Sequence, residues 1–128
     1  MTERGFRVLG LDHVQITTPE EFENDVVAWY RDVLGLTELS KPEGTRSGGA
    51  WFQAGWAELH VSIDQHNPPK AAHFGLVVDD FERVIERLRE VGCHIEQAMA
   101  IPGRERFYTR DPAGNRVEVG RLDEQGRT

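Results

Sequence analysis

Two histidines, His13 and His73, lie inside apolar stretches at corresponding places in the two halves of the chain. An imidazole among apolar neighbours is unfavourable unless its ring nitrogens find partners, and a divalent metal ion is one such partner. A lone histidine in this setting is more often a core residue that hydrogen-bonds its neighbours. Because two histidines occupy equivalent places, we predict instead that they share a metal ion.

Glu118, in the last apolar stretch of the chain, is the third candidate ligand. It stands between Val117 and Val119, and side chains alternate along a strand, so its carboxylate should point away from both valines. If the valines face the core, Glu118 faces the other side of the sheet, which is a cavity wall when the sheet is curved. Two imidazoles and one carboxylate form a facial set that leaves coordination positions open for substrate or water.

The strand predicted at 57–63 offers a fourth ligand, but the residues leave two choices. Glu58 and His60 are two positions apart and therefore share one face of the strand. Both side chains can point inward, and both can equally lie on a solvated face.

Four further residues are candidates for substrate contact. Gln15 is two residues after His13 and should project to the same side. The rings of Trp51 and Tyr108 offer an aromatic wall, and the guanidinium of Arg106 offers a fork that binds anions. Core packing is an equally good role for the two aromatic residues, and a surface salt bridge is an equal alternative for the arginine.

The elements that must position these residues follow from the hydrophobic periodicity of the chain. In the first half, a β-branched stretch predicts a strand. Pro19 then opens an amphipathic helix behind the cap residue Thr18, and Gly35 stops it. The elements predicted for this half are a strand at 8–17, a helix between Pro19 and Gly35, and strands at 36–40, 50–54 and 57–63.

A break at His66–Lys70, which contains two prolines, divides the chain near its middle, because proline cannot donate to a sheet ladder. The order of elements then starts again, with Asp79 or Asp80 as the cap of the second helix. This internal repeat predicts a single domain over 1–128, made of modules at about 8–65 and about 71–120, with a polar tail at 121–128. The elements predicted for the second half are a strand at 71–78, a helix at 81–91, and strands at 94–98, 105–109 and 116–119, with a turn at 111–115.

Three motifs within these elements carry a family resemblance: Trp29–Gly35 (WYRDVLG), His73–Asp79 (HFGLVVD) and Asp111–Glu118 (DPAGNRVE). Together with the repeat, they resemble the vicinal oxygen chelate superfamily, which includes glyoxalase I, extradiol dioxygenases and bleomycin-resistance proteins. The resemblance runs from about Leu11 to Val119. It implies an α+β fold in which two βαβββ modules form a cupped, partly closed mixed sheet around a metal-binding cavity.

In that superfamily the metal ligands come from the first and last strands of each module, which implies the two histidines and Glu118 named above. The fourth ligand depends on the alignment. Aligning Gly55 with the glycine that commonly precedes this strand implies His60, whereas aligning on the Glu-Leu pair of glyoxalase I implies Glu58. We predict His60, keep Glu58 as the alternative, and expect a divalent metal ion, whether zinc, nickel, manganese or ferrous iron.

The resemblance implies a metal-dependent enzyme of the glyoxalase or dioxygenase type, which acts on a small molecule chelated to the metal through vicinal oxygens. Lyase, isomerase and dioxygenase chemistry all fit this description, and no individual catalytic residue is assigned. The alternative is a non-catalytic protein that sequesters a ligand or drug, as bleomycin-resistance proteins do. Those proteins typically lack the metal ligands, so the presence of the ligands here favours the enzyme.

The formal net charge of −7 argues against a nucleic-acid partner, because phosphate binding draws on a basic face. No apolar run is long enough to cross a bilayer, and residues 1–10 lack the apolar stretch of a secretory signal. The single cysteine cannot form an internal disulfide, which agrees with a reducing compartment. We therefore expect a cytoplasmic protein with no membrane partner.

Sheets built from two small modules have open edges, and proteins commonly cover such edges. The family that the chain resembles usually does so by dimerising, so we predict a homodimer that acts on a small-molecule substrate. The sequence leaves open whether each site lies within one chain or is shared across the dimer.

Overall fold

The computed structural model describes residues 5–65 and 71–122. The first repeat comprises β1 (His13–Thr18), a 3-10 turn η1 (Glu20–Phe22), α1 (Glu23–Ala28), a π-helical turn η2 (Trp29–Val33), β2 (Thr37–Leu39), β3 (Ala50–Ala54) and β4 (Ala57–Ile63). The second repeat comprises β5 (His73–Val78), α2 (Phe81–Glu90), β6 (Glu96–Gln97), β7 (Arg106–Arg110) and β8 (Arg116–Arg121). The predicted proline break at 66–70 and most of the predicted polar tail lie outside the described residues.

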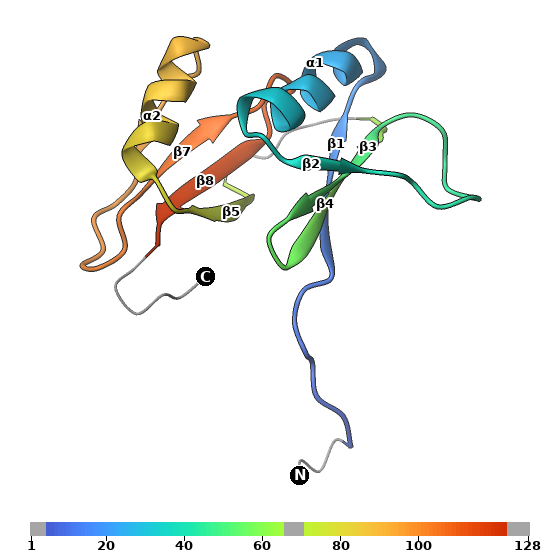
Figure 1. Ribbon diagram of the computed structural model, residues 1–128, viewed down its shortest axis with the longest axis horizontal. Coiled ribbons are helices and arrows are strands. Elements are labelled where there is room, and N and C mark those ends of the chain that lie inside the picture. Colours follow the sequence, from blue (N-terminus) through green and yellow to red (C-terminus); the bar gives the residue numbers. More distant parts are fainter. Residues whose placement is uncertain (1–4, 66–70, 123–128) are drawn as a thin grey trace.

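Each repeat forms a four-stranded mixed sheet, with the strand orders β1-β4-β3-β2 and β5-β8-β7-β6. β1 pairs with β4, and β5 with β8, in parallel, and the other neighbours are antiparallel. These sheets confirm the predicted α+β fold of two βαβββ repeats. The two sheets are not closed (Figure 1), and β1 and β5, which carry the two histidines, are edge strands.

β1 is shorter than the strand predicted at 8–17. It begins only at His13, because its partner β4 starts at Ala57 and the register pairs His13 with Glu58. Leu9 and Leu11, which precede it, are exposed. The first half of the strand prediction is therefore wrong, since a strand needs a partner strand as well as a β-branched pattern.

The two helices differ in how closely they follow the prediction. α2 begins as expected, because the Asp80 side chain accepts a hydrogen bond from the backbone N–H of Arg83 at 3.1 Å. The prediction that Thr18 caps the first helix is wrong. The Thr18 hydroxyl donates to the Pro19 carbonyl, and the helical segment starts as a 3-10 turn at Glu20.

No helix within the described ranges is long and apolar enough to cross a membrane.

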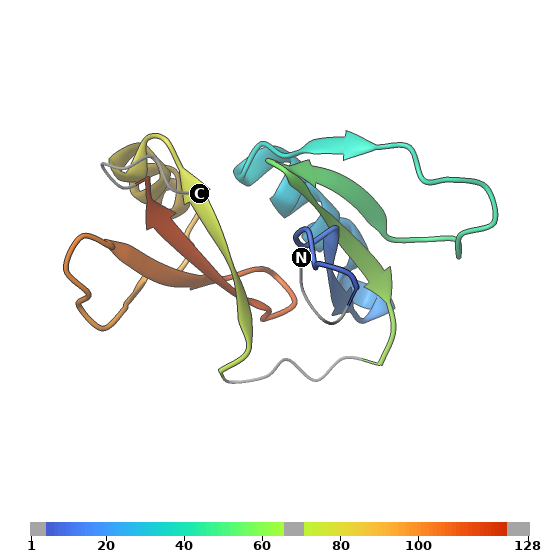
Figure 2. The same cartoon turned by 90° about the horizontal axis from the view of Figure 1, so that it is seen from below.

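The two repeats share one hydrophobic core on the helical side of the sheets. Both helices lie on the same side of the molecule (Figure 1), and the two sheets lie side by side when the molecule is seen from below (Figure 2). Between ring centroids, Tyr30 lies 6.1 Å from Phe52 of its own repeat and 6.4 Å from Phe74 of the second repeat. The buried core consists of Val26, Trp29, Tyr30, Ala50, Phe52, Leu59 and Val61 from the first repeat and Phe81, Leu88, Phe107, Val117 and Val119 from the second.

A buried polar group also joins the repeats. The Tyr30 hydroxyl donates to Asp111 Oδ2 at 2.7 Å, and Asn115 Nδ2 donates to the Thr17 carbonyl at 3.0 Å. Asp111 Oδ1 accepts from the backbone N–H groups of Ala113 and Asn115, which is typical of an aspartate that opens a turn. Burial, and then the charge and hydrogen bond of Asp111, raise the pKa of Tyr30 well above its ordinary value. The repeats are thus fixed to each other from the helical side, away from the predicted ligands.

Candidate functional site

The first repeat holds His60 between two aromatic rings. His60 lies between Leu59 and Val61, which are core residues, so alternation along β4 turns its imidazole to the opposite face. The ring stacks on Trp51, with 3.7 Å between centroids and 5° between planes, and on His13, with 4.2 Å and 15°. Trp51 is the direct partner of His60 in the β3–β4 register. The sandwich leaves His60 only 6% exposed, although it lies on the face away from the core.

Each predicted polar residue of the first repeat has a polar partner. His60 Nε2 lies 2.9 Å from Glu58 Oε1, so the two alternatives for the fourth ligand contact each other. His13 Nδ1 lies 2.9 Å from the carboxylate of the residue before it. Gln15 Nε2 donates to Ser62 Oγ at 3.2 Å. In the first repeat, the two imidazoles thus stack on each other, and each contacts a different carboxylate.

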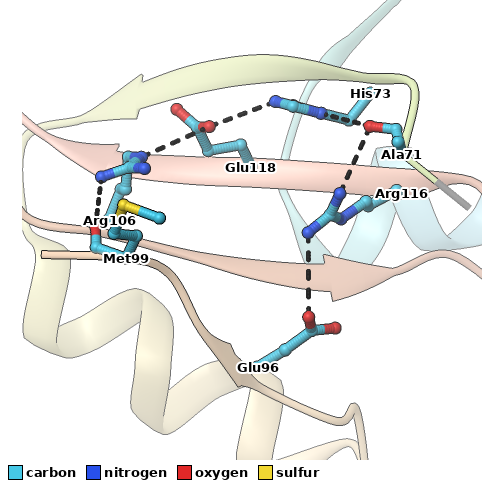
Figure 3. Close-up of polar contacts among 7 residues, drawn as sticks. All are labelled: Ala71, His73, Glu96, Met99, Arg106, Arg116 and Glu118. Atoms are coloured by element: carbon cyan, nitrogen blue, oxygen red, sulfur yellow. Dashed lines mark hydrogen bonds and ion pairs between the residues drawn. The ribbon is translucent and has the colours of Figure 1, made fainter.

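The second repeat brings His73 and Glu118 together. His73 Nε2 lies 3.2 Å from Glu118 Oε1, while His73 Nδ1 lies 2.8 Å from the Ala71 carbonyl (Figure 3). The His73 ring meets Tyr108 edge to face, with 5.1 Å between centroids. The carbonyl contact orients the ring so that its second nitrogen is turned toward the carboxylate.

Two arginines flank this pair. Arg106 Nε lies 3.6 Å from Glu118 Oε1. The guanidinium of Arg116 lies over the Tyr108 ring, 3.6 Å from its centroid, and 3.7 Å from Glu96 Oε1. The sequence prediction included Arg106 but missed Arg116. The signal was available, because Arg116 is two positions before Glu118 and so shares its face of β8.

The alternation predicted around Glu118 is confirmed. Val117 and Val119 are fully buried in the core, whereas the Glu118 side chain is 24% exposed. Its carboxylate therefore projects from the side of the sheet that the core does not occupy.

The two repeats place their candidate ligands at equivalent register positions. His60 pairs with the second residue after His13, and Glu118 pairs with the second residue after His73. By the same register, Glu58 is the equivalent of Arg116, not of Glu118. The matching positions are Gln15, His60 and Trp51 in the first repeat and Gly75, Glu118 and Tyr108 in the second.

One chain does not bring the two pairs together. His13 and His60 lie on the first sheet, and His73 and Glu118 lie on the second. Within the described residues, no group of three or more histidine, cysteine, aspartate or glutamate side chains is placed to hold a metal ion. The four predicted ligands are therefore two half-sets, each formed within its own repeat.

Comparison with known proteins identifies the family. A model of the Glyoxalase/Bleomycin resistance protein/Dioxygenase superfamily matches residues 10–119. The chain belongs to this superfamily. The match confirms the resemblance seen in the sequence motifs, and it covers both repeats.

Solved structures of the glyoxalase/bleomycin resistance protein/dioxygenase superfamily are similar to this chain over most of its length. A glyoxalase family protein from Bacillus anthracis is 35% identical, with 91% of this chain and 97% of that chain covered and a TM-score of 0.84. Lactoylglutathione lyase from Agrobacterium tumefaciens is 25% identical, with 89% and 94% covered and a TM-score of 0.68.

A third similar structure shows the fold alone. It is TnmS3, an antibiotic binding protein from Streptomyces sp. CB03234, which is 16% identical, with 91% and 98% covered and a TM-score of 0.72. Proteins similar to this chain therefore include both an enzyme and a binding protein, and both kinds of function are possible on this fold.

Proposed function

We propose that the protein is a metal-dependent enzyme of the glyoxalase or dioxygenase type, which acts on a small molecule through two adjacent oxygen atoms. His13, His60, His73 and Glu118 would hold a divalent metal ion. The observation that carries this proposal is the register equivalence of His60 and Glu118, each of which pairs with the residue two positions after an edge-strand histidine. The donor set fits a divalent ion, because imidazole and carboxylate groups together suit zinc, nickel, manganese and ferrous iron.

His60 is preferred to Glu58 as the fourth ligand for the same reason. Glu58 occupies the register position of Arg116, a cation, whereas His60 occupies that of Glu118. Glu58 would instead orient His60, since its Oε1 lies 2.9 Å from His60 Nε2. A hydrogen-bonded carboxylate behind a ligating histidine is the common arrangement in metal sites.

A second copy of the chain would complete the site, and we propose a homodimer on that basis. Both half-sets include a histidine on an open edge strand, so pairing of β1 of one copy with β5 of the other would bring unlike half-sets together. An apolar groove of about 700 Å³ between the repeats, lined in part by Leu36, Trp56 and Leu76, offers further surface for association. Trp56 is 93% exposed in the single chain, which is unusual for so large an apolar ring.

The protein groups around the metal position would bind and orient the substrate. When bound, the metal would act as a Lewis acid that stabilises negative charge on the chelated oxygens. The Trp51 ring stacks on His60 at 3.7 Å, so it holds the imidazole and excludes water from one side. Gln15 and Tyr108 offer hydrogen-bonding groups on the first and second sheets, and Arg106 offers positive charge beside Glu118.

Metal analysis of the purified protein tests the site. After reconstitution with zinc or nickel, the wild-type protein should retain a stoichiometric amount, and His73→Ala should lose it. His94→Ala is the matched control, because His94 is exposed on the same repeat and belongs to neither half-set. A wild-type protein that retains no more metal than His73→Ala would refute the metal site.

Co-expression of two variants, each lacking one half-set, tests whether the metal site is shared between two chains. One copy carries His13→Ala with His60→Ala, and the other carries His73→Ala with Glu118→Gln. If unlike half-sets meet across a dimer, each variant alone binds no metal, but the co-expressed mixed dimer regains one intact site. A mixed dimer that still binds no metal would show that the site lies within one chain.

Turnover separates the enzyme from the ligand-sequestering alternative. Metal-loaded protein should convert at least one member of a panel of α-oxo acids, thiohemiacetals and catechols, and product formation can be followed by mass spectrometry. Tight binding of a panel member without any conversion would instead support a sequestering protein.

A further inference from the structure

A polar cavity of about 230 Å³ lies beside His60, between β4 and the loop that joins β2 to β3. Its lining includes Gln15, Trp51 and Ser62, together with the loop residues Lys41 and Arg46. Neither of these two cations is used by the proposed metal site. The cavity therefore adds a charged compartment next to one of the half-sets.

Two glycines allow the loop to press against β4. Gly49 has φ +69°, and a Cβ there would lie 2.0 Å from the Val61 carbonyl oxygen. At Gly48, with φ +82°, a Cβ would lie 2.7 Å from Ile63 Cδ1. No other residue fits so close an approach with a left-handed backbone. The contact places the loop directly over the strand that carries His60.

Hydrogen bonds hold the loop in this position. The Lys41 ammonium donates to the carbonyls of Arg46 and Gly48, which closes the loop on itself. Glu23 Oε2 accepts from the Gly49 backbone N–H at 2.6 Å, and Arg46 Nη2 donates to the Ile63 carbonyl at 3.2 Å. The cavity wall is thus built by specific contacts at both ends of the loop.

The charge of the cavity is opposite to that of the chain. The chain carries a formal net charge of −7, yet the residues that line the cavity include Lys41 and Arg46 and no aspartate or glutamate. Within the described residues, neither cation forms an ion pair with a carboxylate, and the hydrogen bond of Arg46 uses Nη2 alone. The Arg46 guanidinium has five N–H donors, and the Ile63 carbonyl uses one of the two on Nη2. One of the two bidentate edges of the guanidinium therefore remains for a planar oxyanion.

We propose that this cavity binds a carboxylate group of the substrate, with Arg46 as its fork, Lys41 as a second positive charge, and Gln15 and Ser62 as further hydrogen-bonding groups. The inference rests on the proposed function and deepens it. The substrate class is a small organic acid that carries a carboxylate in addition to the oxygens that chelate the metal. The volume of about 230 Å³ lies below the range of pockets for drug-sized ligands and suits a carboxylate with a few carbon atoms.

A titration of the full-length, metal-free protein with malonate tests the inference. Two-dimensional ¹H–¹⁵N NMR should show shifts at the amides of Arg46, Gly48 and Gly49 and at the Trp51 indole. Malonamide, the neutral analogue, should leave these signals in place at the same ionic strength. Arg46→Gln should raise the malonate dissociation constant at least about tenfold, because a charge-assisted hydrogen bond is lost.

Arg89→Gln is the matched control, since Arg89 is exposed on α2, outside the cavity. It should leave malonate binding unchanged, and the spectra report whether each variant is folded. Equal shifts with malonamide, equal weakening by Arg89→Gln, or shifts centred on Arg106 and Arg116 would each overturn the inference. The malonate titration uses metal-free protein and so does not depend on metal binding. A protein that binds malonate but no metal would refute only the metal site. A protein that binds metal but no malonate would refute only the carboxylate site.

Discussion

The two repeats share a register but differ in the chemistry at each matching position. Where the first repeat has His60, stacked between two rings with its side chain 8% exposed, the second has Glu118, whose side chain is 24% exposed. The neighbours differ as well, because Glu118 lies 3.6 Å from Arg106 whereas His60 lies 2.9 Å from Glu58. One repeat thus supplies imidazole groups in an aromatic setting, and the other supplies a carboxylate group beside arginines.

This difference shows why neither repeat can form the proposed site alone. Two copies of the first half-set would lack the carboxylate ligand, and two copies of the second would lack the stacked imidazole pair. A mixed set keeps negative charge low while leaving coordination positions open. On the proposed function, the divergence of the repeats would supply unlike ligands, while the shared register keeps His60 and Glu118 at equivalent positions in their sheets.

The loops that precede β3 and β7 give the largest expected contrast in stability. Gly49→Ala should lower the free energy of unfolding by about 3 kcal/mol or more, since it adds a left-handed side chain that collides with the Val61 carbonyl. Gly103→Ala, at φ +76° with open space around the new Cβ, should cost only about 1–2 kcal/mol. Urea unfolding measures both. Equal losses would mean that the first loop is not pressed against β4.

The two carboxylates on the predicted ligand face should differ in their effect on metal affinity. Glu118→Gln should weaken zinc binding more than about a hundredfold, because it removes a metal ligand. Loss of a residue that only hydrogen-bonds a ligand already weakens metal binding up to about a hundredfold. Glu58→Gln should weaken it only about tenfold, since the new amide still accepts a hydrogen bond from His60. Competition with a fluorescent chelator measures both constants. A larger effect at Glu58 would identify that residue as the ligand in place of His60.

Tyr30→Phe should lower the free energy of unfolding by about 1–3 kcal/mol, because it removes the buried hydrogen bond between the repeats from Tyr30 to Asp111. The pKa of Tyr30 is raised by burial and by Asp111, so the hydroxyl ionises more readily in the unfolded chain. Its contribution is therefore present below about pH 10 and is lost as the pH rises above that value. Urea unfolding near pH 8 and near pH 11 should show a steeper alkaline loss for wild type than for Tyr30→Phe. Equal losses would contradict this role for Tyr30.

The helix caps give the smallest expected contrast. Asp80→Ala should destabilise the protein by about 1 kcal/mol, because it removes the side-chain cap of α2. Asp79→Ala, one residue earlier, should change stability by less than about 0.5 kcal/mol. The first repeat has no side-chain cap at Pro19 to lose. Thermal unfolding distinguishes the two variants, and an equal effect of Asp79→Ala would show that the charge, not the cap, matters.

Much of the fold was readable from the sequence because local patterns decide single elements. β3 and β4 occur at the predicted bounds, and α2 begins at the predicted residue. The predictions failed where a partner decides the outcome. The first half of the strand expected at 8–17 did not form, because it has no partner strand. The first helix has a 3-10 turn at its start and a π turn at its end, and Trp29 and Tyr30 of the π turn contact the second repeat.

The candidate site divides in the same way. The sequence alone placed His13 and His73 at equivalent points of a repeat and turned Glu118 away from its valine neighbours, because strand alternation depends only on position along the chain. Spacing could not choose between Glu58 and His60, since both share a face, and only the register across β1 and β4 favours His60. Arg116 was missed although its spacing from Glu118 places it on the same face of β8. The cavity at Lys41 and Arg46 could not be predicted, because charged loop residues carry no periodic signal.

What the sequence determined by itself is therefore the repeat and most of its elements, which rest on periodicity and local turn chemistry, and it predicted His13, His73 and Glu118 as donor groups. Only the tertiary structure decided that the donors form two half-sets on separate, open sheets. That outcome depends on contacts between residues far apart in the chain, above all the bond of Tyr30 to Asp111 and the shared core beneath the helices. Such contacts arise from packing and burial, which no local pattern encodes.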